Sequence, residues 1–101
     1  MIRVMDIIDE ALAVYGIENQ VRMYMEEAAE LTVELNKMLR GRTDNAHGIA
    51  EEIADVQIML AQLTRYYLIS EEVEKVRNAK YARLAKRLGF EEEGAVRLPA
   101  E

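Results

Sequence analysis

The sequence Met25-Glu26-Glu27-Ala28-Ala29-Glu30-Leu31 places three carboxylates among small and apolar residues, and Glu51-Glu52-Ile53-Ala54-Asp55-Val56 repeats the arrangement further along. In each segment acidic residues lie three or four positions apart, so a helix presents them on one face. Like charges at these spacings repel by roughly a few tenths of a kcal/mol per pair, and by more when partly buried. Two such faces close together therefore predict a divalent-metal site between two helices.

The apolar residues around both segments recur at helical spacing, and no convincing strand pattern occurs. Gly16, Gly41 and Gly89 are expected to end helices, and Ser70 is expected to be the N-cap of the last one. The first expected helix runs from about Arg3 to Tyr15, and the second begins near Ile17 to Asn19 and ends at about Arg40. The third and fourth run from about Ala46 to Leu68 and from Glu71 to about Leu88. The pattern predicts an all-α fold with a four-helix bundle-like subunit, in which residues 1–89 form a single domain and residues 90–101 a loose tail.

The third expected helix is apolar on most of its sides. It carries no charge from Val56 to Thr64, and its expected heptad seam consists of Ile49, Ile53, Val56, Leu60, Leu63 and Tyr67, while Ala50, Ala54, Ile58, Met59 and Ala61 occupy other faces. A small four-helix monomer covers such a helix incompletely. We therefore expect an obligate homo-oligomer, a dimer or tetramer, with this helix in the interface.

Composition excludes several classes of function. The 101-residue chain has a net charge of −6, which argues against binding a nucleic-acid polymer but leaves a single nucleotide with Mg²⁺ open. It contains no cysteine, so thiolate-bound zinc and iron-sulfur centres are excluded. It shows neither a signal peptide nor a membrane-span pattern, and a cytoplasmic location is the default expectation.

The acidic residues of the two helices predict a hard-cation site. Antiparallel packing across a short loop would bring Glu26, Glu27 and Glu30 close to Glu52 and Asp55. Carboxylate oxygens suit Mg²⁺ or Mn²⁺. In a chain this acidic, the other interpretation is a solvated helix face. Before the acidic segment, Gln20 lies on roughly the same face as Glu27 and is a candidate contact to a base or sugar.

The order Glu26-Glu27-Ala28-Ala29-Glu30, then Glu52-Ile53-Ala54-Asp55, resembles the signature of the MazG-like all-α nucleoside triphosphate pyrophosphohydrolases. Downstream, Asn78-Ala79-Lys80-Tyr81-Ala82-Arg83 is similar to the Asn-x-Lys-aromatic-x-Arg segment of many members. The resemblance covers about Tyr15 to Leu88. It implies hydrolysis of a nucleoside triphosphate between the α and β phosphates, giving monophosphate and pyrophosphate, and it implies helical dimers or tetramers.

Carried over by position, the resemblance implies that the metal ligands are Glu27, Glu30, Glu52 and Asp55. It also implies phosphate contacts by Lys80, supported by Asn78 and Arg83. One departure is Leu84, which stands where some members have a second Arg, so that Arg83, Arg87 or a partner subunit would supply that contact. Glu26, beside the ligands, is the candidate for orienting or deprotonating water, or a further ligand.

Two alternatives remain open from the sequence. One is a phosphoribosyl-ATP pyrophosphohydrolase, whose family has similar acidic segments but commonly a lysine before the first of them, where Met23 and Tyr24 stand here. The other is a non-catalytic helical oligomerisation or regulatory module whose acidic faces stay solvated.

Overall fold

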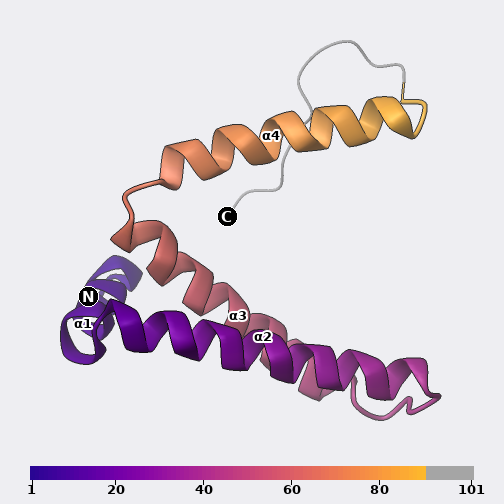
Figure 1. The fold of residues 1–101 in the computed structure, drawn as a ribbon, viewed down its shortest axis with the longest axis horizontal. Helices are drawn as coiled ribbons and strands as arrows, with labels where there is room; N and C mark the ends of the chain where they lie inside the picture. Colours follow the sequence, from indigo (N-terminus) through magenta and orange to yellow (C-terminus); the bar gives the residue numbers. More distant parts are fainter. Residues whose placement is uncertain (91–101) are drawn as a thin grey trace. The chain divides into compact units, whose positions relative to one another are not determined.

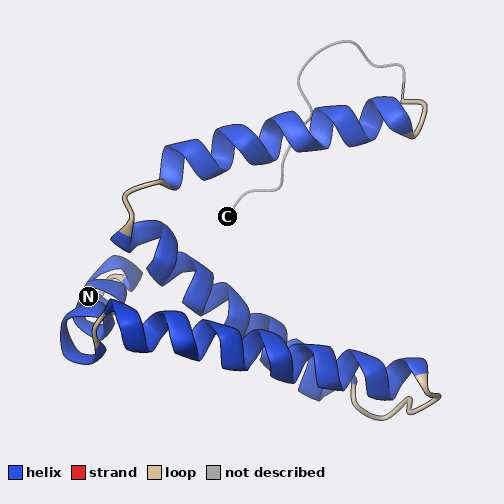
Figure 2. Cartoon of the chain, in the orientation of Figure 1, coloured by secondary structure: helices blue, strands red, loops and turns tan. Residues whose placement is uncertain are grey.

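The computed structural model describes residues 1–90, and over that range the protein is helical without a strand (Figure 2). The helices are α1 (Val4–Tyr15), α2 (Ile17–Leu39), α3 (Ala46–Tyr66) and α4 (Ser70–Arg87). The all-α prediction is confirmed. Of the expected tail, residues 91–101 lie outside the described part of the chain.

The chain divides into two compact units, Met1–Leu68 and Ile69–Glu101. In the first unit, α2 and α3 form an antiparallel pair joined by a short loop, and α1 packs against both of them (Figure 1). The second unit contains α4. Within residues 1–90, no helix is both long and apolar enough to cross a membrane.

Two partly buried hydrogen bonds from the Asn45 side chain join α2 to the residue before α3 at the loop end of the pair. Asn45, just before α3, donates from Nδ2 to the backbone oxygen of Glu34 at 2.9 Å and to its Oε2 at 3.0 Å. Hydrogen bonds from Asn45 and then from Lys37 hold the pKa of Glu34 below its usual range. Gly48 lies on the adjacent turn of α3, where a Cβ atom would stand 3.3 Å from Glu34 Oε2. A small residue here permits the close approach of the two helices.

The structure matches the predicted heptad seam of α3 only in part. Three of its residues are half-buried: Ile49, Val56 and Leu63. Ile53 and Leu60, assigned to the seam, are 42% and 44% exposed, whereas Met59, assigned to another face, is buried at 6%. The apolar residues surround α3 so completely that their pattern carries little information about which side faces inward. The side of α3 that faces α2 is instead marked by polar residues that contact α2, namely Asp55 and Gln62.

The helix ends agree with the expected positions to within two residues, but one cap differs. Ser70 is the first residue of α4 rather than its N-cap; Ile69 precedes it and makes no side-chain capping bond. Leu68, after α3, has a φ of +56°, a conformation that non-glycine residues seldom adopt. At the other turn, Gly16 has a φ of +83° and joins α1 directly to α2, which is why a glycine suits that junction.

An ion pair fastens α1 to α3. Arg65 Nε lies 2.9 Å from Asp9 Oδ1 and its Nη2 lies 3.2 Å from Asp9 Oδ2. Hydrogen bonding to Arg65 lowers the pKa of Asp9. Both side chains are exposed, so the ion pair contributes little to the free energy of folding.

Replacement of Asn45 by alanine should lower the free energy of unfolding by about 1–2 kcal/mol, because it removes a buried donor and leaves acceptors of Glu34 unpaired. Urea denaturation at one fixed protein concentration measures this loss. Arg42→Ala is the matched control in the same loop, because it removes only the exposed ion pair with Asp44. It should cost less than about 0.5 kcal/mol, and equal losses in the two variants would contradict the assignment.

Candidate metal centre

Three carboxylates from two helices meet in the middle of the α2–α3 pair. Glu27 of α2 and Glu52 and Asp55 of α3 each offer an oxygen atom, and these atoms lie within 4.8 Å of one another. Glu27 and Glu52 are half-buried and Asp55 is exposed. Four metal ligands were predicted from the sequence, and the structure brings together three of them, all except Glu30.

The pairing follows a regular register. Gln20 Nε2 donates to Gln62 Oε1 at 2.7 Å, Glu27 lies beside Asp55, and Glu34 lies beside Gly48. Each step of seven residues forward along α2 matches seven residues backward along α3, as expected for antiparallel helices packed at heptad spacing. The carboxylates therefore occupy one layer of a continuous interface.

The proximity of these groups shifts their titration. The pKa of Glu27 is raised to about 7, first by burial and then by hydrogen bonding to Glu52 and by the charges of Glu30 and Asp55. Burial likewise raises the pKa of Glu52, against a lowering effect of its hydrogen bond with Glu27. The pair therefore favours sharing one proton over carrying two full charges.

The carboxylates lack a basic counterpart. Within residues 1–90, no ion pair joins Glu27, Glu52 or Asp55 to a lysine or arginine. Among the described residues, the buried oxygens Glu27 Oε2 and Glu52 Oε2 have no hydrogen-bond partner. Orphaned anionic oxygens of this kind fit a hard divalent cation.

The other two acidic candidates lie at the edge of this group. Glu30 is exposed, but its charge acts on the pKa of both Glu27 and Glu52, so it lies near them. Glu26 is exposed and is not one of the three clustered carboxylates. On the same helix, Arg22 pairs with Glu18 outside this group, with its Nη2 2.8 Å from Glu18 Oε1.

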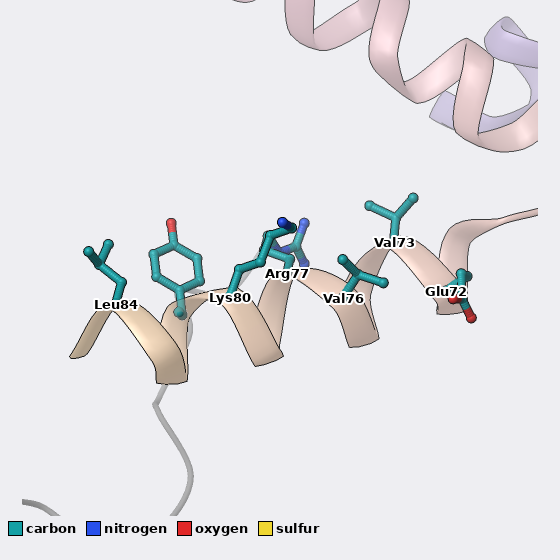
Figure 3. Close-up of a pocket in the computed structure, with 7 residues that line it drawn as sticks. Glu72, Val73, Val76, Arg77, Lys80 and Leu84 are labelled. Atoms are coloured by element: carbon teal, nitrogen blue, oxygen red, sulfur yellow. The ribbon is translucent and has the colours of Figure 1, made fainter. Parts of the chain in front are cut away.

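The candidate substrate contacts are divided between the two units. Gln20 is buried against Gln62, whereas Asn78, Lys80 and Arg83 are exposed residues of α4, which belongs to the second unit. Lys80 projects from one side of α4 into a shallow groove with Val73, Val76, Arg77 and Leu84 (Figure 3). Neither Asn78 nor Arg83 lines that groove.

Sequence reasoning missed Gln62, the buried partner of Gln20. Its signal is present in the sequence, because it is a polar residue inside the uncharged run of α3 and follows Asp55 by seven positions. Gln20 precedes Glu27 by the same interval. A search for polar residues at matched heptad positions on both helices would have found the pair.

Comparison of the chain with models of protein families, with curated proteins and with solved structures yields no match.

In the absence of metal, the melting temperature should fall as the pH rises from about 4.5 to about 8. The reason is that the pKa of Glu27 is raised from 4.5 to about 7 in the folded chain. Between these two values the folded chain holds a proton that the unfolded chain has released, so a rise in pH favours the unfolded chain. Thermal melts in EDTA across this range measure the effect. Glu27→Gln, which cannot ionise, should flatten the decline, and an unchanged profile would contradict the assignment.

Proposed function

We propose that the protein is a Mg²⁺-dependent nucleoside triphosphate pyrophosphohydrolase, which hydrolyses ribo- or deoxynucleoside triphosphates between the α and β phosphates to monophosphate and pyrophosphate. The observation that carries the proposal is the group of Glu27, Glu52 and Asp55, with its buried oxygens that lack partners. The ordered acidic segments and their resemblance to MazG-like enzymes support it.

Glu27, Glu52 and Asp55 are the proposed ligands of Mg²⁺, or of Mn²⁺ in its place, with Glu30 completing the set. The ion, when bound, would neutralise the carboxylates and the substrate phosphates and would acidify a water molecule. A triphosphate is itself a polyanion, so an acidic site of this kind accepts it only together with divalent cations.

The chain's own residues have separate proposed roles. Glu26 is exposed beside Glu27 on α2, where its carboxylate can orient the attacking water or take its proton. Lys80 would donate to phosphate oxygens, with Asn78 and Arg83 as supporting contacts. Lysine suits this role because its ammonium group is a mobile point charge on a long stem.

We further propose that the subunit is four-helix bundle-like and assembles as a homodimer or homotetramer. Large apolar side chains on the α2–α3 pair are exposed in the single chain, among them Met25 at 60%, Ile58 at 56% and Leu60 at 44%. Only Ile8 and Met59 are buried apolar residues within residues 1–90. Association of copies would remove this surface from water.

The remaining parts of the proposal concern partners and location. The substrate is a single nucleotide rather than a nucleic-acid polymer, because the net charge of −6 opposes wrapping by a phosphate backbone. Nucleoside triphosphates are cytoplasmic metabolites, and we place the protein in the cytoplasm.

Glu27→Gln and Asp55→Asn should each lower Mg²⁺-dependent pyrophosphate release by at least about 100-fold, because each removes an anionic ligand. A screen of the common ribo- and deoxynucleoside triphosphates, dUTP and oxidised analogues, with Mg²⁺ or EDTA, measures this, and circular dichroism checks that the helices persist. Glu18→Gln is the matched control on α2, because Glu18 pairs with Arg22 outside the group.

The outcomes of the same screen separate the alternatives. With phosphoribosyl-ATP added to the screen, pyrophosphate release from that substrate alone would favour a phosphoribosyl-ATP pyrophosphohydrolase. Absence of release from every substrate, together with no Mg²⁺-dependent gain in melting temperature, would favour a non-catalytic module.

Sedimentation at micromolar concentration should show a dimer or tetramer, and Leu60→Glu should shift it toward monomer, because a charge would then be buried in an apolar interface. Gln57→Glu is the control, since Gln57 is exposed one turn away on α3 and already polar. A parent chain that sediments as a monomer would overturn the proposed assembly.

A further inference from the structure

A buried amide pair lies one heptad from the carboxylates, at the end of the α2–α3 pair away from its loop. Gln20 and Gln62 are 6% and 4% exposed, and they are joined by a 2.7 Å hydrogen bond across 42 residues of sequence. The second amide contact, from Gln62 Nε2 to Met59 Sδ, measures 3.7 Å. Two glutamines therefore occupy positions where apolar residues would have packed at lower desolvation cost.

The loop end has its own fastening. Asn45 and Glu34 are joined one heptad from the carboxylates in the opposite direction. The repelling group of Glu27, Glu52 and Asp55 thus lies between two hydrogen-bonded layers. Short loops restrict the closed end of a helix pair, but nothing in a loop controls the rotation of the helices at the open end. Apolar contacts are non-directional and tolerate such rotation, whereas a buried hydrogen bond has a defined geometry.

We propose that Gln20 and Gln62 are positioning residues, which fix the register and rotation of α2 on α3 so that Glu27 faces Glu52 and Asp55. The inference rests on the proposed function in one respect, because the group that it positions is the proposed metal site. It gives Gln20 a role through Glu27 rather than a contact with the substrate. Preorganisation of repelling ligands lowers the cost of binding a cation.

The test replaces both amides by an apolar side chain of similar length. Gln20→Met alone leaves Gln62 Oε1 without its donor and should lower the melting temperature, whereas Gln20→Met with Gln62→Met should recover most of that loss. Despite this recovery, the double variant should bind Mg²⁺ roughly tenfold or more weakly, as measured by calorimetry. Asp9→Asn is the control, because it loses the exposed contact with Arg65 but leaves the interface between α2 and α3 intact.

A distance measurement tests the positioning without metal. The chain has no native cysteine, so nitroxide labels can be attached at Arg22→Cys and Gln57→Cys, both exposed positions, in samples diluted with unlabelled chain. The parent should give one narrow distance, and the double methionine variant a broadened or second one, since a shift of one helical turn moves a label by about 5 Å. Gln62→Glu, which keeps an oxygen acceptor for Gln20, should retain the parent's distribution.

The outcomes distinguish the two proposals. Superimposable distance distributions in the parent and the double methionine variant would overturn the positioning role, whatever the metal binding. Broadened distances in a protein whose parent form binds no Mg²⁺ would keep the positioning role and reject the metal-dependent function. If the double variant fails to fold, Gln62→Met against Gln62→Glu supplies the same comparison, and equal distributions would overturn the inference.

Discussion

Repulsion among the carboxylates of Glu27, Glu52 and Asp55 is the constraint around which the α2–α3 pair is built. Their oxygens lie within 4.8 Å of one another, and burial raises the pKa of two of them. A helix pair selected for stability alone would place apolar side chains in this layer, because desolvated charges without counterions destabilise the folded state. The layers on either side must therefore supply the contacts that keep the helices together, and they do so by side-chain hydrogen bonds.

The three layers share one position in the heptad of α2 but differ in how their polar atoms are satisfied. Gln20 finds Gln62, and Glu34 finds Asn45 and Lys37. In the central layer, by contrast, Glu27 Oε2 and Glu52 Oε2 have no partner among residues 1–90. Buried polar atoms are ordinarily paired. Asn45 Oδ1 in the layer of Glu34 also lacks a partner, but it is a neutral amide oxygen, whereas the two orphaned oxygens of the central layer belong to carboxyl groups.

The helices could be predicted because periodicity and glycine positions are local features of the sequence. The inward face of α3 could not be predicted in the same way. The heptad pattern assigned Ile53 and Leu60 to the seam, but both are exposed, and the buried residues of α3 are Met59 and Gln62. An almost uniformly apolar helix gives little signal for which side faces inward. Spacing alone likewise treated Glu26 and Glu27 alike as neighbours of Glu30. The register, in which Gln20 meets Gln62, turns Glu27 inward and leaves Glu26 exposed. Ser70 was misassigned by one residue, because α4 begins at Ser70 itself and Ile69 is its N-cap.

In the proposed assembly, the surface around the carboxylates links metal binding to self-association. Ile53 lies beside Glu52 in sequence and is 42% exposed, and Met25 precedes the acidic residues of α2 and is 60% exposed. Covering such side chains would exclude water from the neighbouring layer, and a lower local dielectric strengthens both the repulsion among carboxylates and their attraction to a cation. Association of metal-free chains would then be weakened by the repulsion among the carboxylates, whereas association of metal-bound chains would not. Because linkage is reciprocal, association of copies would in turn strengthen metal binding.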